Sequence, residues 1–393
     1  MARRVTIARL LTVAAVVALA FSASALTGCG GRDDEPTPVS DLRTATVVRL
    51  TDTDASLEAP ELVATHRLPA GSIVEVDASS RAAVRSVTGL PHPLQRFSLL
   101  DLKTGSFTTL LDQAVGHDAG YDIVDVRVSD SIAVWLETDM TSGAWRVFAA
   151  DLPGSTLGSP LEVAFGGAGT LLPSIGVSGN DVLWLVAPDP EAAVPAPEAV
   201  LYALLMGSDG EPRTLFTSAS TVSNPLTVAG RAATVVERAR VGGVRQSTVR
   251  AFDIDTDKEV ASLAVPAPIN PSDATYLNGR FTFSVPARYD GVGPLGDVGT
   301  YLQIGSTEFI RITRQPMDTP AFVSGRFVSK VGRGIVVVEG ESKTHVELPS
   351  VDKLPDYGEY LASNGIASSV VTFTSPEVGA GQQPYTVVQV YSY

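Results

Sequence analysis

One short segment of this chain brings together side chains that can move a proton. His117 and Asp118 are adjacent, and Asp122 follows shortly after them. An imidazole beside a carboxylate can act as a general acid or base, or can orient a ligand. The glycine spacing of a nucleophile elbow does not occur around any serine, so no serine triad is indicated. We therefore name these three residues as candidate binding residues and assign no catalytic residue, with an ordinary surface histidine as the alternative.

Three arginines form a second candidate site. Arg238, Arg240 and Arg245 lie in a segment that the sequence predicts to be a loop between two strands. The chain has a net charge of -14, so a local positive cluster stands out as a place to bind an anionic ligand. The simpler interpretation, which we favour, is ion pairing with acidic residues of neighbouring loops such as Glu137 and Asp139.

Two other segments match binding motifs only in part. Residues 291–296 have the glycine spacing of a dinucleotide loop, but Tyr301–Ile304, a predicted strand, follows where that motif needs a helix. Residues 253–257 resemble the start of a calcium loop, but Lys258 and Ala264 stand where glycine and glutamate are required. The sequence thus predicts no cofactor and no metal site in these segments. It leaves open whether carboxylates elsewhere bind calcium or magnesium.

The first 28 residues have the layout of a secretory signal peptide. Arg3, Arg4 and Arg9 precede an apolar stretch from Leu10 to Leu26, and no acidic residue occurs before Asp33. The apolar stretch is short for a helix that spans a bilayer. We expect residues 1–28 to be removed, with a retained anchor helix as the alternative. Both interpretations place the rest of the chain outside the cytoplasm.

The apolar stretch ends in Leu26-Thr27-Gly28-Cys29, which resembles the lipobox of bacterial lipoproteins. In that family the cysteine thiol receives a diacylglycerol, and cleavage then makes the cysteine the first residue. The resemblance implies that Cys29 is lipidated, with acyl chains such as palmitate, and anchors the protein to the cell membrane. Residues 29–40 would then be the lipidated cysteine and a flexible, polar tether.

Composition excludes several classes of protein. The chain has 43 acidic and 29 basic residues among 393, and this excess of negative charge repels nucleic acid. Only 18% of residues are charged and 44% are hydrophobic, which is unlike a disordered chain. Cys29 is the single cysteine, so a disulfide scaffold and a thiol redox pair are excluded.

From residue 41 onward the chain consists of short runs of β-branched and aromatic residues separated by turn residues, a pattern typical of strands. A small or polar pair recurs between two apolar strands, at intervals of 50, 49, 51, 49, 46 and 39 residues. The seven pairs are Ser79-Ser80, Ser129-Asp130, Ser178-Gly179, Ala229-Gly230, Asn278-Gly279, Ser324-Gly325 and Ser363-Asn364.

Each unit continues with two further strands, and a repeated four-stranded sheet of this length is typical of a β-propeller blade. We predict an all-β fold, a single seven-bladed β-propeller spanning residues 41–393, with six or eight blades as alternatives. The last unit ends with Tyr385–Tyr391, one strand short. We expect Thr44–Leu50 to fill that gap, so that an N-terminal strand closes the ring and hides the sheet edges.

The strand and turn pattern resembles the bacterial propeller superfamily that includes TolB-like and quinoprotein-like domains. The chain lacks the Ser-Pro-Asp-Gly turn of TolB-like repeats, so the resemblance implies an architecture and no activity. The loops between second and third strands are the longest, and we expect them to form a binding face together with the connections between blades. Trp135 and Trp184 occupy equivalent second strands and are predicted to pack between blades.

These observations predict a lipid-anchored protein of the cell envelope that acts as a non-catalytic binding or scaffold module. Its partners would be the membrane, through Cys29, and an envelope protein or ligand, but not nucleic acid. One alternative is a propeller hydrolase, lyase or glycan-binding protein that uses the central channel. Another is an accessory subunit of an envelope complex.

Overall fold

The computed structural model describes residues 42–77, 79–87, 95–167, 169–208, 210–223, 225–267, 269–286, 294–312 and 319–393. Every described residue belongs to one compact unit, Val39–Tyr393. The predicted signal peptide (residues 1–28), the tether (29–40) and Cys29 lie outside the described residues. Within the described ranges, no helix is both long and apolar enough to cross a bilayer.

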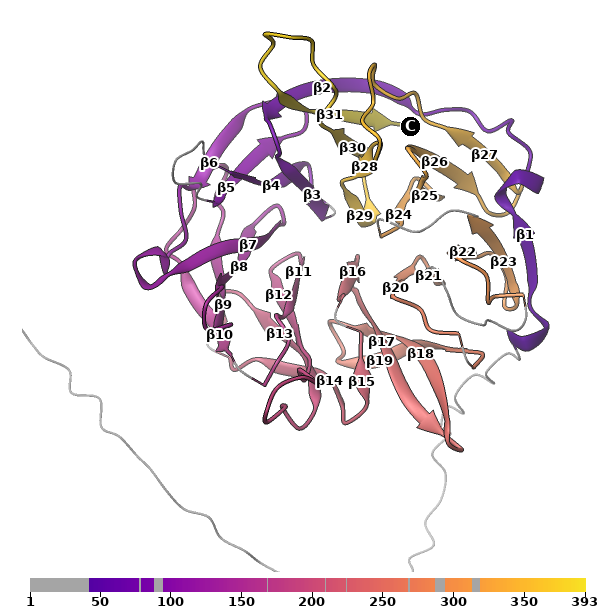
Figure 1. The fold of residues 1–393 in the computed structure, drawn as a ribbon, viewed down its shortest axis with the longest axis horizontal. Helices are drawn as coiled ribbons and strands as arrows, with labels where there is room; N and C mark the ends of the chain where they lie inside the picture. The colour runs from indigo at the N-terminus through magenta and orange to yellow at the C-terminus, as the bar shows by residue number, and fades with distance from the viewer. Residues whose placement is uncertain are drawn as a thin grey trace, which may run out of the picture. The chain divides into compact units, whose positions relative to one another are not determined.

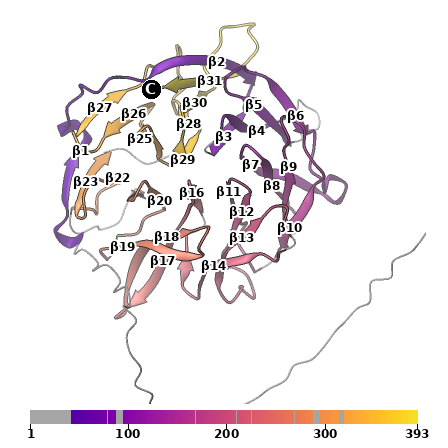
Figure 2. The same ribbon diagram turned by 180° about the vertical axis from the view of Figure 1, so that it is seen from behind.

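The described residues form 31 β-strands and three short 3-10 helices, η1 (Leu42–Thr44), η2 (Leu50–Asp52) and η3 (His117–Ala119). The sheets are arranged in a ring around a central axis (Figure 1). The view from behind shows the same ring (Figure 2). The prediction of an all-β propeller is confirmed.

Five sheets of four or five strands stand as separate blades. Two of them are β7 (Tyr121–Val128), β8 (Ile132–Asp139), β9 (Trp145–Asp151) with β10 (Leu161–Gly166), and β11 (Ser174–Ser178), β12 (Asp181–Val186), β13 (Ala199–Leu205) with β14 (Arg213–Ser218). A third contains β15 (Thr221–Val222), β16 (Thr227–Ala229), β17 (Ala232–Val241), β18 (Val244–Asp253) and β19 (Lys258–Val265). The fourth contains β1 (Thr46–Arg49), β20 (Asp273–Leu277), β21 (Arg280–Val285), β22 (Gly299–Gln303) and β23 (Glu308–Ile312). The fifth contains β2 (Glu61–Pro69), β28 (Tyr360–Leu361), β30 (Val370–Thr374) and β31 (Tyr385–Ser392).

The other strands belong to one nine-stranded sheet in the order β27-β26-β25-β24-β29-β3-β4-β5-β6. Its members are β3 (Ile73–Asp77), β4 (Arg81–Val87), β5 (Gln95–Asp101), β6 (Phe107–Leu111), β24 (Ala321–Val323), β25 (Arg326–Val331), β26 (Gly334–Glu339), β27 (Thr344–Glu347) and β29 (Ser363–Ala367). The structure therefore has five separate blades among its described residues. The predicted count of seven blades is wrong, and so are the alternatives of six and eight.

The count fails because strand β29 pairs on both of its sides. It runs parallel to β24, where Phe322 lies opposite Ile366, and parallel to β3, where Asn364 lies opposite Asp77. These pairings join the β3–β6 strands and the β24–β27 strands into one sheet. A sequence repeat counts hairpins, but it does not reveal that strands near the axis hydrogen-bond to each other.

The seventh predicted turn is also misplaced. Ser363 and Asn364 lie inside β29, and the chain turns after Ala367 instead. Gly365 explains the irregularity, because it has a positive φ of 57° and a Cβ there would lie 2.3 Å from the carbonyl oxygen of Val228. Only glycine permits this close approach of two inner strands.

An N-terminal strand does pair with the C-terminal strand, but it is not the predicted one. Strand β2 pairs antiparallel with β31, with Leu62 opposite Tyr391 and Pro69 opposite Tyr385. The predicted segment, Thr44–Leu50, contributes β1, which instead pairs in parallel with β23. Both segments have alternating apolar residues, so composition did not separate them. The nine residues of β2 match the eight of β31, whereas β1 has only four.

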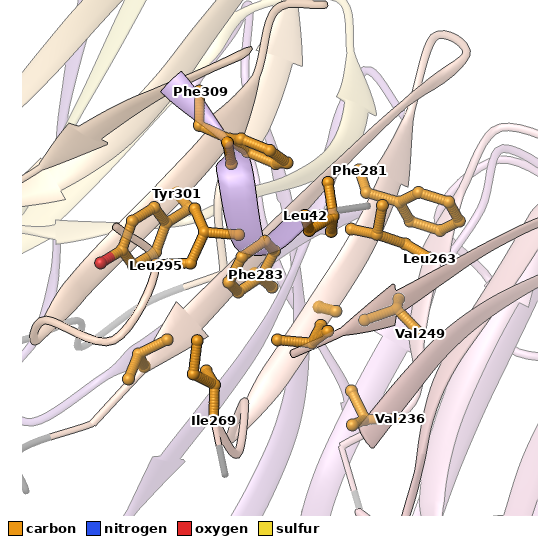
Figure 3. Close-up of a cluster of buried hydrophobic side chains, with 14 of the residues drawn as sticks. Leu42, Val236, Val249, Leu263, Ile269, Phe281, Phe283, Leu295, Tyr301 and Phe309 are labelled. Atoms are coloured by element: carbon orange, nitrogen blue, oxygen red, sulfur yellow. The ribbon is translucent and has the colours of Figure 1, made fainter. Parts of the chain in front are cut away.

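Hydrophobic clusters fill the spaces between neighbouring sheets. In the cluster of Figure 3, Phe283 stacks on Tyr301 with ring centroids 5.1 Å apart and meets the edge of Phe309 at 5.8 Å. Val249 and Leu263 of the preceding blade complete this contact. Such aromatic pairs contribute about 0.5–1.5 kcal/mol each beyond their buried area.

The two tryptophans predicted to pack between blades do so. Trp135 is fully buried, stacks on Phe148 at 5.4 Å and contacts Phe97 of strand β5. Trp184 is buried in a cluster with residues of the β7–β10 blade. These contacts make the ring a rigid frame for its loops.

Candidate functional site

The long connections between second and third strands gather at one end of the blades, as predicted. In the β7–β10 blade, Tyr121 at the start of β7 lies opposite Asp139 at the end of β8. The first and second strands of a blade are antiparallel. The connection that leads into the first strand therefore lies at the same end of the blade as the loop after the second strand. We call this end the loop face. Helix η3 and the loop from Asp139 to Ala144 both belong to it.

The structure does not bring His117, Asp118 and Asp122 together as a reactive group. His117 is half-buried and Asp118 is exposed. Oδ1 of Asp122 accepts hydrogen bonds from the backbone N–H groups of Ile123 at 2.9 Å and Gln95 at 3.3 Å. The Asp122 carboxylate therefore holds the backbone, and an enzyme built on His117 has no geometric support here.

The segment with the three arginines is a hairpin and not a loop. Strands β17 and β18 pair without interruption up to Val241 opposite Val244, and Arg240 lies opposite Arg245. Arg240 and Arg245 are exposed. Arg238 is half-buried, and its Nη2 donates to the carbonyl oxygen of Pro271 at 2.7 Å.

The predicted pairing of these arginines with Glu137 and Asp139 is wrong. Glu137 is fully buried and its carboxylate accepts from the N–H groups of Val115 and Gly116, at 2.6 and 2.9 Å, and from Nε1 of Trp135 at 3.0 Å. Asp139 accepts from the backbone of its own turn, at 2.9 Å from the N–H of Thr141. Both carboxylates shape the loop face, and Glu137 fixes the chain that leads into η3.

Apolar side chains are exposed on the loop face. Met140 is 80% exposed and Val194 is 82% exposed, on the second-to-third loops of two neighbouring blades. Val241 and Val244, at the tip of the β17–β18 hairpin in the next blade, are 59% and 54% exposed. Between these blades lies a hollow of 340 Å³, bordered by Pro188, Pro197, Arg238 and others. Exposed apolar groups with polar neighbours are typical of protein-binding surfaces.

A second candidate site lies among the inner strands, at a cavity of 220 Å³ that both polar and apolar residues line. Its charged lining consists of Glu75 and Asp77 on β3 and Arg127 on β7, with Asn364 on β29 beside them. We call this the axial cavity. Its apolar walls come from β11, β16 and the β28–β29 segment.

Arg127 is the centre of the charge cluster in the axial cavity. Its Nη1 lies 3.0 Å from Oε2 of Glu75 and 3.6 Å from Oδ1 of Asp77, and its Nε lies 3.4 Å from Oδ1 of Asp125. Asn364 donates from Nδ2 to the same Glu75 oxygen at 2.6 Å. Three carboxylates thus surround one guanidinium, a formal charge of -2 in a partly enclosed space.

Burial dominates the electrostatics of this cluster. It raises the pKa of Asp77 to about 7, against the lowering effect of Arg127 and with a further increase from Glu75 and Asp125. The pKa of Glu75 is also raised by burial, and Arg127 again opposes the rise. Burial disfavours the charged form of Arg127, but Asp125, Glu75 and Asp77 outweigh it and raise the pKa of this guanidinium.

Sequence reasoning missed this cluster, although a signal was present. The segments Glu75-Val76-Asp77 and Asp125-Val126-Arg127 alternate charged and apolar residues within strands that begin a blade. Alternation places the charged side chains of such a strand on one face and the apolar ones on the other. A charged face on an inner strand indicates a polar channel.

Comparison with known proteins rests on structure alone. No family model matches the chain, and no curated protein matches it. The β-propeller domain of the trilobed protease from Pyrococcus furiosus aligns with a TM-score of 0.53 at 10% identity, covering 81% of this chain and 95% of that one. The chain has the β-propeller fold.

Two further neighbours have different lengths and functions. A puromycin-hydrolysing peptidase from Mycobacterium tuberculosis aligns with a TM-score of 0.52 at 15% identity, covering 88% of this chain and 55% of that one. This chain therefore spans about half the length of that peptidase. BamB from Moraxella catarrhalis aligns over 85% of this chain and all of that one at 13% identity, with a TM-score of 0.42 that supports no argument. At these identities the likeness shows the fold and not the activity.

Proposed function

We propose that this protein is a lipid-anchored β-propeller of the cell envelope that binds a protein partner through its loop face, without catalysing a reaction. The observation that carries the proposal is the exposure of Met140, Val194, Val241 and Val244 on three neighbouring blades. Burying apolar side chains of this size against a partner gains about 25 cal/mol per Å². Single exposed apolar residues are common, but a series on consecutive blades of a rigid ring is typical of an interface.

The charges of the loop face favour a partner with acidic groups near its apolar contact. Arg240 and Arg245 are exposed beside the two valines of the hairpin tip. Neither arginine has an ion-pair partner within the described ranges. Arginine beside apolar residues is a frequent combination in the energetically dominant part of protein interfaces. This assigns Arg238, Arg240 and Arg245 to the proposed interface.

Membrane attachment is the second part of the proposal, and the sequence supports it through Leu26–Cys29 and the tether of residues 30–40. Two or three acyl chains on Cys29 would hold the protein firmly, since one chain alone gives only marginal binding. We expect Cys29→Ser to abolish labelling by radioactive palmitate and to move the protein out of the membrane fraction. Retention of the label in that variant would remove the lipid anchor from the account.

The interface is tested by charge substitutions at the hairpin tip. The double variant Val241→Asp and Val244→Asp places two carboxylates on the hairpin tip. There they would face the acidic and apolar surface that the proposal expects on the partner. Leu205→Asp is the matched control, because Leu205 is 45% exposed at the end of β13, on the opposite end of a blade. Each protein is purified from solubilised membranes under identical conditions.

We expect a partner in stoichiometric amount with the wild type and with Leu205→Asp, and its loss from the double variant. Since all three positions are exposed, stability should change by less than about 0.5 kcal/mol in each variant. A partner retained by the double variant, or lost equally from Leu205→Asp, would exclude the loop face as the interface. A partner that is recovered at a constant stoichiometry would indicate that this protein is a subunit of an envelope complex.

A further inference from the structure

The axial cavity holds a hydrogen-bond acceptor that the protein does not use. The side chain of Asp77 is 10% exposed, and its Oδ2 is buried and has no hydrogen-bond partner among the described residues. Leaving a buried acceptor unpaired is unfavourable, and more so for a charged group. A donor that enters the cavity would recover part of this cost.

One oxygen of each neighbouring carboxylate is already engaged. Oε2 of Glu75 receives Arg127 and Asn364, and Oδ1 of Asp125 receives the N–H of Val126 at 2.8 Å. Calcium needs six to eight oxygens around one point. Among the described residues, no group of three or more His, Cys, Asp or Glu side chains is arranged to hold a metal. A buried carboxylate with an unpaired oxygen, in a cavity of negative charge, instead matches an N–H donor that carries positive charge.

An aromatic hollow adjoins the axial cavity. It measures 390 Å³, includes Tyr357, Tyr360 and Phe373, and shares Glu75 and Leu361 with the axial cavity. Tyr360 stacks on Phe373, with ring centroids 5.4 Å apart. Lys330 already lies over the Tyr360 ring, with its Nζ 4.5 Å from the centroid, so the hollow offers apolar ring surface to an aliphatic stem.

The sizes of the two spaces limit what can bind. Pockets for drug-sized ligands occupy about 300–1,000 Å³, whereas the axial cavity measures 220 Å³. The axial cavity therefore fits one charged head group, and the aromatic hollow fits the chain that carries it.

We propose that the axial cavity binds a protonated amine or guanidinium group, which donates hydrogen bonds to the carboxylate of Asp77 while its aliphatic stem lies in the aromatic hollow. The group comes either from a small diffusible amine or from a lysine or arginine side chain of a protein. This site is separate from the loop-face interface, and the test of one proposal does not depend on the other.

The site carries a pH dependence with a defined sign. The groups that face Asp77 are Glu75 on its own strand, and Asp125 and Arg127 on β7. Asn364 is opposite Asp77 on β29 and is uncharged. Since the pKa of Asp77 is about 7, its ionised fraction rises about tenfold between pH 6 and pH 8. Binding of a cation should strengthen by a similar factor.

The test uses two matched pairs of probes and the full-length protein purified from membranes. Putrescine is compared with 1,4-butanediol, and acetyl-Gly-Lys-Gly-amide with acetyl-Gly-Gln-Gly-amide, by calorimetric titration at pH 6 and pH 8. The variant Asp77→Asn removes the charge with little change of shape. Asp112→Asn is the control, because the Asp112 side chain is 77% exposed and pairs with Arg96 on the surface.

We expect at least one cationic probe to bind, its neutral match not to bind, and Asp77→Asn to weaken binding at least tenfold while Asp112→Asn leaves it unchanged. Putrescine binding alone would indicate a small amine, and peptide binding alone would indicate a side chain. Equal binding of a cation and its neutral match, or unchanged affinity in a folded Asp77→Asn protein, would overturn the proposal. The pH series on the wild type decides the question independently of any variant, since affinity that is flat or falls from pH 6 to pH 8 contradicts it.

Discussion

Replacing Asp77 with asparagine should make this protein more stable at alkaline pH. In the folded chain, burial raises the pKa of Asp77 to about 7, from a usual value of 3.8. Between these two pH values the folded protein keeps a proton on Asp77 that the unfolded chain has released. Stability therefore falls as the pH rises through this window. Asparagine cannot ionise, so the variant escapes that loss.

The size of the effect follows from the width of the window. The two pKa values differ by about three pH units, and each unit corresponds to about 1.4 kcal/mol, which gives an upper limit of about 4 kcal/mol. Water that enters the axial cavity reduces the cost of ionisation. We expect Asp77→Asn to equal the wild type at pH 4 and to exceed its free energy of unfolding by about 1–4 kcal/mol at pH 8.

Urea unfolding followed by tryptophan fluorescence measures this directly, because Trp135, Trp145 and Trp184 are all buried. Titrations at pH 4, 6 and 8 give the free energy of unfolding of both proteins, with Asp112→Asn as the surface control. A variant that is less stable than the wild type at pH 8 would refute the reasoning. So would a difference that does not change with pH, since the pKa of Asp77 would then be the same in the folded and the unfolded chain.

Three further predictions test other contacts. Arg127→Met leaves the carboxylates of the axial cavity without their cation. The free energy of unfolding should therefore fall by about 3–5 kcal/mol at pH 8 and by less at pH 5. An equal loss at both pH values would contradict this. Glu137→Gln weakens the bonds that hold the chain before η3, and stability should fall by about 1–3 kcal/mol, with faster hydrogen exchange at the amides of residues 115 and 116. Unchanged exchange there would show that Glu137 does not fix this connection. Cysteines at Thr65 and Gln389, which face each other in β2 and β31, should form a disulfide under mild oxidation, and a failure to link would contradict the closure of the ring by β2.

The sequence was informative where turn chemistry and strand patterning agree. Asn278 and Gly279 have positive φ angles of 45° and 80° and join β20 to β21, as their residue types predict. The burial of Trp135 and Trp184 followed from their equivalent positions in second strands. These features depend on local contacts, which a repeat in the sequence reveals.

Long-range pairing was beyond the reach of the sequence. Residue types alone do not identify Glu61–Pro69 instead of Thr44–Leu50 as the partner of β31, because both segments near the N-terminus mix apolar and polar residues. The parallel contacts of β29 depend on how closely Gly365 approaches β16, and a one-dimensional period does not contain that information.

The residues of the candidate sites also divide into those that local sequence could place and those that depend on long-range contacts. The hairpin that carries Arg240 and Arg245 was predicted as a loop, although Gly242-Gly243 between two valines is itself a hairpin signal. Glu137 was assigned to the surface because of its charge, whereas three hydrogen-bond donors hold it in the interior. Asp77 and Arg127 meet only because the ring places β3 beside β7.

The loop-face interface is tested most directly by photo-cross-linking in intact cells. Benzoylphenylalanine is introduced at Val244 on the hairpin tip and, in a separate protein, at Leu205 on the opposite end of a blade. The account predicts a discrete cross-linked partner from position 244 and none from position 205. A partner linked from position 205, or no adduct from position 244 in a protein that is made and folded normally, would contradict it.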